Sequence, residues 1–358
     1  MQWDLYCRVV DNFGDLGVCW RLATDLASRG ERVRLWVDDA SALAWLAPGG
    51  APGVVVRAWP SIGSAPPGID TPVGDVVVAA FGCTLPDAML AALAGASPRT
   101  VWINLEYLSA ETYVERSHGL PSLQSTGAAA GATQWFYYPG YTAATGGLLR
   151  ESDLAARRQS FDRATWRASV GLLPRDGERL VSLFCYDPQP ALPALIEALS
   201  DVPTLLLVTP GAATRQARDL LGTGLSRGRV RGVALPWLAQ PDYDHLLWAS
   251  DLNCVRGEDS WVRAQWAGRP FLWQAYPQGD RVHAAKVHAF LDRSLEQAPG
   301  ALATAVRAWS AAWNGLAPSP AALPDLTAWQ LQSQHWRDRL WAEPDLATKL
   351  IGFVAARR

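Results

Sequence analysis

Two aspartates in one short loop near the N-terminus are the first residues whose types and spacing can do chemistry. Asp11 and Asp15 belong to the stretch DNFGDLG (residues 11–17), which also holds two glycines and a phenylalanine. Acidic side chains repel a pyrophosphate, and the stretch lacks the third glycine of a dinucleotide-binding fingerprint. The loop therefore fits a cation or a hydroxyl group. A structural alternative stays open, in which Asp15 only caps the helix predicted near Val18 and the glycines form the turn.

A second cluster, NCVRGEDSWVR (residues 253–263), repeats the order of strand, loop and helix. Arg256, together with the amides at the start of the helix that includes Ser260, can bind a diphosphate. The alternative is a surface pair of Arg256 with Glu258, with Asp259 or Ser260 as the N-cap of the helix. Aromatic and amide side chains end neighbouring predicted strands on the same sheet edge: Phe184, Tyr186, Gln274 and Tyr276. This convergence favours a ligand site.

Composition excludes several classes of function. The 32 basic and 34 acidic residues give a formal charge of −2, so no net basic field recruits nucleic acid or anionic lipid. The five histidines share no ligand spacing and the five cysteines include no C-x-x-C pair, so we expect neither a metal site nor a disulfide framework. No G-x-S-x-G elbow or Walker loop occurs.

The chain also lacks the patterns of a membrane or secreted protein. No uninterrupted apolar run reaches the ~18 residues of a membrane span. Asp4 and Arg8 stand where a signal peptide needs an apolar core. We therefore expect a cytoplasmic protein without a membrane partner.

An α/β fold must position these residues, because short apolar β-rich runs alternate with helical stretches through most of the chain. In the first half we predict strands at 5–10, 33–37, 54–57, 76–80 and 100–105, and helices at 18–29 and after Pro86. In the second half we predict strands at 180–185, 204–208, 230–235, 252–255 and 270–274. Small residues followed by an aromatic run predict a loop over 127–140.

The length of 358 residues allows two domains of ~150 residues each. The junction is expected in the polar helical segment 150–170 and the turn at 174–177, with the first domain at 1–165 and the second at 175–340. The tail after Ala321 lacks strand signals. Trp329, Trp336 and Trp341 follow at intervals that can share helix faces, so we expect this tail to pack across both domains.

Five stretches in chain order make the sequence similar to a known family. They are residues 11–23, 102–111, 118–122, 145–151 and 256–260. Together they resemble the bacterial protein-arginine rhamnosyltransferases of translation elongation factor P, the EarP family, over nearly the whole chain. The resemblance implies a GT-B-like fold of two Rossmann-like, doubly wound domains that face each other across a cleft. Residues 1–165 would then take the acceptor, 175–340 the sugar nucleotide, and 341–358 would form a C-terminal helix that returns to the first domain.

The resemblance also implies a reaction and its residues. L-Rhamnose would pass from dTDP-β-L-rhamnose to an arginine of elongation factor P, with inversion and without a cofactor or metal. Asp11 and Asp15 match the acidic loop that engages the acceptor arginine, and Glu258 matches a third essential carboxylate. The positions that match those holding the nucleotide are Tyr186, Trp237, Gln240, Arg256, Asp259, Ser260 and Tyr276. Trp237 falls where the family has an aromatic beside the thymine, often phenylalanine.

Acidic residues suit this chemistry. A guanidinium has a pKa above ~12 and delocalised lone pairs, so it is a poor nucleophile until a carboxylate orients it and accepts a proton. Two other functions stay open. One is a transferase that uses a UDP- or GDP-sugar and a small-molecule or lipid acceptor, because base selectivity depends on a few contacts. The other is a protein that binds elongation factor P or a nucleotide without turnover, which the acidic residues in both domains argue against.

Overall fold

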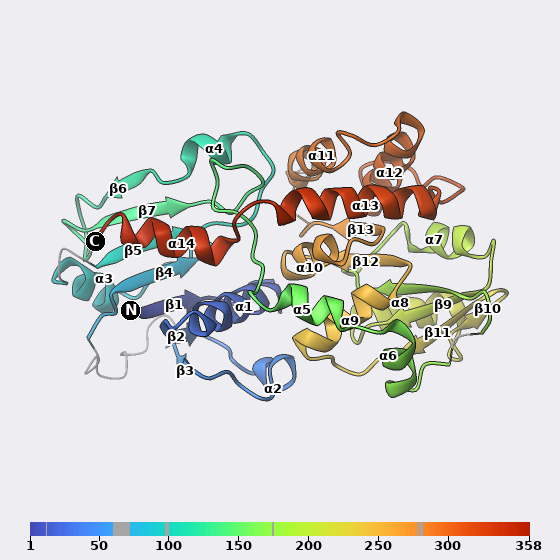
Figure 1. The fold of residues 1–358 in the computed structure, drawn as a ribbon, viewed down its shortest axis with the longest axis horizontal. Helices are drawn as coiled ribbons and strands as arrows, with labels where there is room; N and C mark the ends of the chain where they lie inside the picture. The colour runs from blue at the N-terminus through green and yellow to red at the C-terminus, as the bar shows by residue number, and fades with distance from the viewer. Residues whose placement is uncertain (12, 60–71, 97–99, 174, 278, 280–281) are drawn as a thin grey trace. The chain divides into compact units, whose positions relative to one another are not determined.

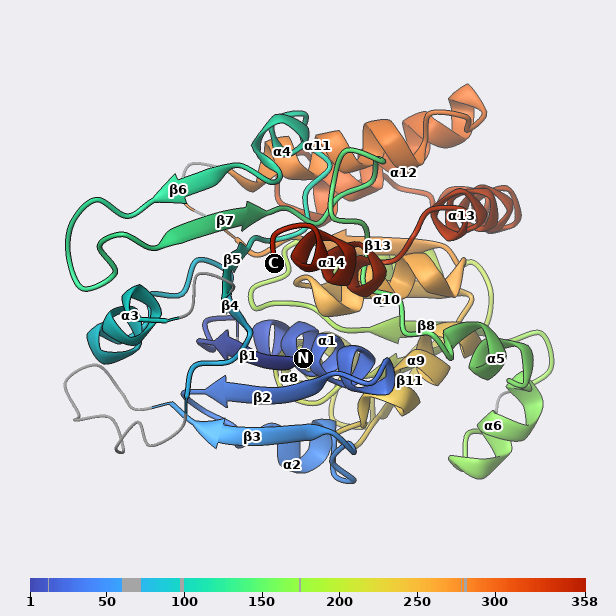
Figure 2. The same cartoon turned by 60° about the vertical axis from the view of Figure 1, so that its left-hand side comes forward.

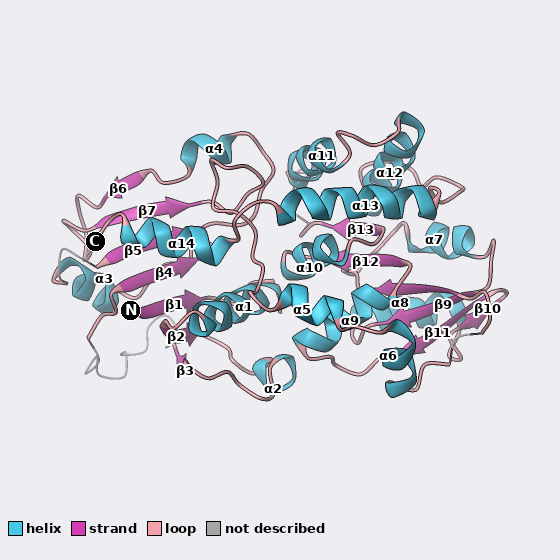
Figure 3. Ribbon diagram, in the orientation of Figure 1, coloured by secondary structure: helices cyan, strands magenta, loops and turns pink. Residues whose placement is uncertain are grey.

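The computed structural model describes residues 1–11, 13–59, 72–96, 100–173, 175–277, 279 and 282–358 (Figure 1). Asn12 of the acidic loop and Pro174 of the predicted turn lie outside the described residues. The chain divides into two compact units, Met1–Ala155 with Ala342–Arg358, and Ala156–Trp341. Each unit holds a mostly parallel sheet with helices (Figure 3), so the predicted α/β class is confirmed.

The first unit is built on a sheet whose strand order reverses between β1 and β4. Its strands, within the described residues, are β1 (Gln2–Cys7), β2 (Arg32–Val37), β3 (Val54–Ala58), β4 (Val76–Ala80), β5 (Val101–Leu105), β6 (Pro121–Leu123) and β7 (Thr133–Tyr137). The order is β3-β2-β1-β4-β5-β7-β6, and all pairs are parallel except β6 with β7. In register, Leu5 pairs with Leu35 on one side and with Val78 on the other. Ligands of such sheets bind outside the carboxyl ends of the strands at this reversal.

Side chains of β1 alternate between the two faces of this sheet, as a period of two residues requires. Trp3, Leu5 and Cys7 belong to one buried cluster, while Tyr6 packs in the cluster on the other face. The helices, within the described part of the unit, are α1 (Gly14–Ser28), α2 (Leu43–Leu46), α3 (Asp87–Ala94), α4 (Tyr113–Ser117) and α14 (Leu346–Ala355). Figure 2 shows α1 and α14 on the same side of the sheet, and both supply residues to the cluster that holds Trp3.

The helix α14 is fastened to the first unit by polar contacts as well as by burial. Asp345 caps it by accepting the amide of Thr348, and Arg29, the C-cap of α1, donates to Asp345 at 2.8 Å. The amide of Leu346 donates to the carbonyl of Leu148 at 2.9 Å. A side chain at Gly147 would meet the carbonyl of Pro344 at 2.8 Å, so only glycine allows this approach.

The second unit repeats the strand order of the first. Its strands, within the described residues, are β8 (Arg179–Leu183), β9 (Thr204–Val208), β10 (Ser226–Arg227), β11 (Val230–Ala234), β12 (Leu252–Arg256) and β13 (Phe271–Gln274). They are ordered β10-β11-β9-β8-β12-β13, and only β10 is antiparallel to its neighbour. The described helices are α5 (Leu154–Gln159), which spans the division after Ala155, α6 (Arg163–Ser169), α7 (Leu192–Leu199), α8 (Ala212–Leu221), α9 (Gln240–Ala249), α10 (Asp259–Ala267), α11 (His283–Ser294), α12 (Gly300–Trp313) and α13 (Leu326–Trp341). The order reverses between β8 and β12, which places the expected ligand edge at their carboxyl ends.

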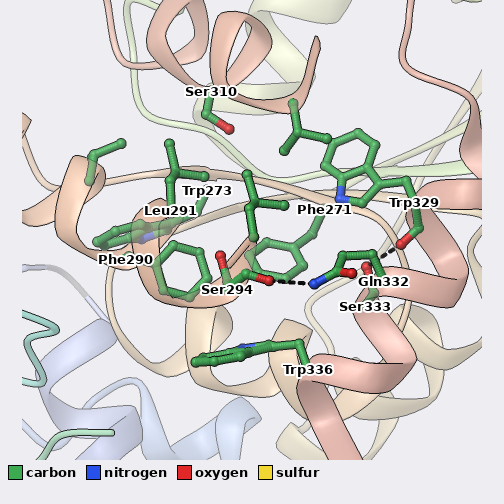
Figure 4. A pocket seen from close by; sticks show the side chains of 13 residues that line it. Phe271, Trp273, Phe290, Leu291, Ser294, Ser310, Trp329, Gln332, Ser333 and Trp336 are labelled. Atoms are coloured by element: carbon green, nitrogen blue, oxygen red, sulfur yellow. Dashed lines mark hydrogen bonds between the residues drawn. The ribbon is translucent and has the colours of Figure 1, made fainter. Parts of the chain in front are cut away.

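Several of the tryptophans belong to the core of this second unit. Figure 4 shows a cavity between β13, α11, α12 and α13, lined by aromatic side chains that include Trp273, Trp329 and Trp336. Gln332 reaches across its rim and donates to the carbonyl of Ser294 at 2.7 Å. All three tryptophans are less than 5% exposed. The cavity is therefore part of the packing of the core.

Several details differ from the sequence predictions. The first strand spans 2–7 where 5–10 was predicted, and the short strands β6 and β10 were not predicted. Residues 133–137 form β7 where a loop was expected, because pairing with β5 orders the aromatic run and buries Tyr137. Helix α1 begins at Gly14 and not near Val18. The units divide after Ala155, inside the segment 150–170 where the junction was expected but before the predicted end of the first domain at 165, because Phe161 stacks on His245 of α9 with ring centroids 5.3 Å apart.

The tail is helical, as expected, and is shared between the units. Helix α13 belongs to the second unit and α14 to the first. In the described part of the chain, no helix has both the length and the apolar composition required to cross a bilayer.

Candidate active site

The acidic loop follows β1 and runs into α1 at the strand reversal of the first sheet. Asp15 is the second residue of α1 and is 3% exposed. One carboxylate oxygen, Oδ2, accepts the amides of Val10 and Asp11 at 2.9 Å each. The N-cap of α1 is Phe13, which makes no side-chain capping bond. The capping alternative for Asp15 is therefore wrong, because its carboxylate closes the preceding loop.

Asp11 lies against the start of the same helix. A side chain at Gly14 would place its Cβ 2.9 Å from Oδ2 of Asp11, so glycine is needed for this close approach. The amide of Gly14 also donates to the carbonyl of Asp11 at 2.7 Å. The amino end of a helix carries partial positive charge, which favours ionised carboxylates there. The structure thus brings both predicted aspartates together at one buried helix start.

Asp15 also accepts a hydrogen bond from a residue that the sequence analysis missed. The hydroxyl of Tyr107, directly beyond β5, donates to Oδ1 of Asp15 at 3.1 Å. The ring of Tyr107 stacks on Phe81, with centroids 4.3 Å apart and planes 14° from parallel. Phe81 follows β4 and has a φ of 58°, a left-handed conformation that costs about 1–2 kcal/mol for a residue with a Cβ. The strained conformation of Phe81 thus places its ring against Tyr107, and Tyr107 in turn binds Asp15.

Glu106 adds another carboxylate to this edge. Asn104 donates to Oε1 of Glu106 at 2.7 Å, and Asn104 in turn accepts the amide of Gly82 at 3.2 Å. Burial raises the pKa of Glu106, although the hydrogen bond from Asn104 opposes the rise. Burial also raises the pKa of Tyr138, the residue after the neighbouring strand β7, and the charge of Glu106 adds to that effect. The edge therefore combines carboxylates with phenol side chains.

The second unit presents a cation at the equivalent edge. Arg256 ends β12, and its guanidinium carbon lies 4.4 Å from the ring centroid of Phe184 and 4.3 Å from that of Tyr186. Both aromatics follow β8, the strand on the other side of the reversal. Tyr186 is fixed in turn, since its amide donates to Oε1 of Gln274 at 2.8 Å. Its ring meets Tyr276 edge-on at 5.6 Å.

The start of α10 organises the loop that follows Arg256. The N-cap is Glu258, without a side-chain capping bond, so the alternative of Asp259 or Ser260 as the cap is wrong. The hydroxyl of Ser260 accepts the amide of Arg256 at 3.0 Å and donates to the carbonyl of the same residue. Glu258 pairs with Lys286, whose Nζ lies 3.8 Å from Oε2.

Two tryptophans stabilise this loop, and the sequence analysis assigned no role to either. Trp261 and Trp273 stack with centroids 3.7 Å apart and planes 2° from parallel. The indole of Trp273 donates to the carbonyl of Gly257 at 2.8 Å, and Gly257 has a φ of 64°. The stack therefore anchors the turn between Arg256 and α10.

The remaining predicted donor residues lie on the same edge of the second sheet. Gln240 begins α9 and donates to Oδ2 of Asp259 at 3.4 Å. Trp237 precedes it in the loop after β11 and is 46% exposed, while Tyr276 beyond β13 is 47% exposed. Exposed aromatic faces beside a cation suit a nucleotide, because the base can stack while the diphosphate meets the charge. Across the described residues, no group of three or more His, Cys, Asp or Glu is arranged to hold a metal ion.

Comparison with known proteins identifies the family. A family model described as "Elongation-Factor P (EF-P) rhamnosyltransferase EarP" matches residues 3–355. The protein-arginine rhamnosyltransferase of Pseudomonas aeruginosa (strain PAO1) is 43% identical over 381 residues, with 99% of each chain covered. A solved structure described as "Structural basis for EarP-mediated arginine glycosylation of translation elongation factor EF-P" has a TM-score of 0.68 at 30% identity, covering 99% of both chains. The structure of "Spinosyn Rhamnosyltransferase SpnG complexed with spinosyn aglycone" has a TM-score of 0.53 at 13% identity, covering 98% of this chain and 99% of that one, which is a likeness of fold alone.

The predicted family, enzyme class and GT-B-like α/β fold are thereby confirmed. The chain belongs to the EarP family of elongation factor P arginine rhamnosyltransferases.

Proposed function

We propose that this enzyme transfers L-rhamnose from dTDP-β-L-rhamnose to an arginine side chain of elongation factor P, with inversion at the anomeric carbon. The observation that carries the proposal is the contrast between the two sheet edges. The first edge holds buried carboxylates at a helix start, and the second holds a guanidinium on aromatic rings. A cationic acceptor suits the first edge, and an anionic leaving group suits the second.

On the acceptor side, Asp11 and Asp15 bind and orient the guanidinium. Two carboxylates can bind its planar fork along two edges. Asp15 is held by two amides and the Tyr107 hydroxyl, so its position is set before the acceptor arrives. Such preorganisation lowers the cost of aligning a nitrogen lone pair with the anomeric carbon.

On the donor side, Arg256 and the amides at the start of α10 bind the diphosphate. In the reaction a guanidine nitrogen forms a bond to C1 of rhamnose while the bond from C1 to the phosphate oxygen breaks. The proton of the attacking nitrogen passes to a carboxylate of the acidic loop, and dTDP leaves with the bonding electrons. Arg256 stabilises the negative charge that develops on dTDP. Trp237 and Tyr276 offer the exposed faces for the base, and Glu258 stays a predicted third carboxylate.

The test is the intact mass of elongation factor P after incubation with the purified enzyme and dTDP-β-L-rhamnose. We expect a gain of one deoxyhexose residue that peptide mapping places on an arginine, and an α-linkage by NMR. Incubation with UDP- and GDP-sugars measures donor choice. Transfer from those donors alone would replace dTDP-rhamnose in the proposal, and binding without any mass gain would contradict catalysis.

A further inference from the structure

Four arginines of the second unit lie toward the amino ends of β12 and β13, the opposite edge from Arg256. Arg158 is placed there by its guanidinium carbon, which lies 5.8 Å from the ring centroid of Trp248 near the end of α9, just before β12. Arg158 comes from α5 (Leu154–Gln159), Arg163 from α6, Arg269 from the turn before β13, and Arg337 from α13. We name them the arginine cluster. Arg163 is joined to Asp251, which directly precedes β12, by an ion pair of 2.9 Å. The arginine cluster is thus separate from the residues assigned to the donor.

The backbone positions two members of the arginine cluster. The guanidinium of Arg337 lies against Gly268, where a Cβ would meet its Nη1 at 2.8 Å. Gly268 ends α10 in the left-handed conformation with a φ of 59°, which disfavours a side chain there. The next residue, Arg269, donates from Nη1 to Oε1 of Gln330 on α13 at 3.1 Å. These contacts fix both arginines where the end of α10 meets α13.

The positive charge of the arginine cluster exceeds the negative charge around it. Arg163 pairs with Asp251, and Arg337 pairs with Asp338 at 2.7 Å. Within the described residues, Arg158 and Arg269 form no ion pair, and Nη1 of Arg158 is buried without a hydrogen-bond acceptor. Four cations therefore face two carboxylates.

The electrostatic consequences agree with this geometry. Burial, together with the charges of Arg337 and Arg269, lowers the pKa of Arg158 to about 10, although Asp338 opposes the change. Burial and the charges of Arg163 and Arg337 also lower the pKa of Arg269, although Asp251 opposes the change. A guanidinium stays charged in proteins, so the members of the arginine cluster repel one another. A bound anion would relieve the repulsion.

We propose that the arginine cluster binds an oxyanion of the phosphate class, with Arg158 and Arg269 as its main ligands. A guanidinium presents its donors in a planar fork that matches phosphate oxygens, and it remains charged under all physiological conditions. The buried Nη1 of Arg158 would gain the acceptor that it lacks. The site does not depend on the proposed glycosyl transfer.

The test is calorimetric titration with inorganic phosphate at constant ionic strength in chloride. We expect saturable binding to the wild-type enzyme, and a loss of affinity of about tenfold or more in Arg158→Gln and in Arg269→Gln, since hydrogen bonds to charged groups contribute at least that much. Arg307→Gln is the matched control. That guanidinium pairs with the exposed Asp292 at 2.7 Å in the same unit, and its loss should leave phosphate affinity unchanged.

A second variant separates the arginine cluster from the donor edge. Phosphate could also occupy the diphosphate site, so Arg256→Ala is titrated in parallel and should retain phosphate binding. If Arg256→Ala abolishes the binding, or if Arg158→Gln and Arg269→Gln both bind as the wild type does, the proposal is wrong. Equal binding of acetate would show a general anion site and would also overturn the choice of phosphate.

Thermal melting shows whether each variant is folded, so that a loss of phosphate binding is not caused by misfolding. Removal of one repelling charge should leave the melting temperature of Arg158→Gln in phosphate-free buffer at or above that of the wild type. Phosphate should raise the melting temperature of the wild type and not that of the variant. A rise of the same size in chloride of equal ionic strength would show charge screening and contradict a site. If Arg158→Gln does not fold, Arg337→Gln is measured in its place. Its melting temperature should likewise not fall in phosphate-free buffer and should not rise with phosphate.

Discussion

Replacing Asp15 by asparagine separates catalysis from structure at the acidic loop. The carboxylate accepts the amides of Val10 and Asp11 through Oδ2 and the hydroxyl of Tyr107 through Oδ1. In Asp15→Asn the amide oxygen can keep the two backbone bonds, because a carbonyl oxygen has two lone pairs. The new NH₂ group faces Tyr107, whose hydroxyl can rotate to accept from it. The variant therefore keeps the shape of the loop and loses its charge.

The expected magnitudes of the two effects differ. Three charge-assisted hydrogen bonds become neutral ones, which costs about 1–3 kcal/mol of folding free energy in total. This should lower the melting temperature by only several degrees. Loss of a general base slows a reaction by about 10²–10⁴-fold, and a misoriented guanidinium adds to that loss. The affinity for dTDP should stay unchanged, because the proposed donor residues belong to the other unit.

The assay is the single-turnover rate of rhamnosyl transfer at saturating elongation factor P, with melting temperature and dTDP calorimetry on the same preparations. Asp38→Asn is the matched control, because this carboxylate also accepts two amides, those of Val9 at 2.9 Å and Asp39 at 3.0 Å. Because Asp38 is exposed and Asp15 is buried, this variant should lose no more stability than Asp15→Asn, and it should keep its rate. Asp11→Asn should lose its rate in the same way as Asp15→Asn. Wild-type rates in both site variants would refute the catalytic assignment.

Three further predictions concern the donor, the metal requirement and pH. Arg256→Ala should weaken dTDP binding by about 10–100-fold in calorimetry, since it removes a charge-assisted contact to diphosphate, and an unchanged affinity would remove Arg256 from the site. Activity should persist in EDTA because Arg256 and helix amides are proposed to stabilise the leaving group, whereas loss that Mg²⁺ restores would contradict this. Burial, and secondarily the charge of Lys349, lowers the pKa of His118 to about 4, and its Nδ1 accepts the amide of Tyr138 at 3.1 Å. The unfolded chain then binds the proton more tightly, so stability should fall by roughly 1–2 kcal/mol from pH 6.5 to 4, after allowance for partial exposure. Urea unfolding of His118→Asn, which keeps an acceptor, should lack this part of the pH dependence.

Local patterns predicted the strands that are buried on both faces. The sequence predicts β4 and β9 at their observed bounds, because Val76–Ala80 and Thr204–Val208 are uninterrupted buried runs. It misses β7, whose aromatic residues neither alternate nor form an aliphatic run. That strand forms through pairing with β5, which is remote in sequence. The start of α1 was misplaced because its first turn contains Gly14 and Asp15, which are weak helix formers.

The residues of the candidate site also fall into two groups: some could be placed from neighbouring sequence, and others only from contacts between remote segments. Asp11, Asp15 and Arg256 stand in strand–loop–helix junctions that are contiguous in sequence, so their place at a sheet edge could be predicted. Tyr107 and Phe81 follow β5 and β4, and only the strand order brings them beside the β1 loop. The stacking of Trp261 on Trp273 depends on the fold in the same manner. Contacts across strands therefore require the structure.

The place of α14 in the first unit has a consequence for biosynthesis. Leu346, Leu350 and Val354 fill the core beside α1, yet the ribosome adds them after the whole of the second unit. A nascent chain that has grown only to Trp341 already contains every residue of the second unit, which is continuous in sequence. Its first unit still exposes the apolar surface that α14 will cover, and exposed surface of this kind favours aggregation during synthesis. The first unit is therefore the first to be synthesised and the last to complete its core.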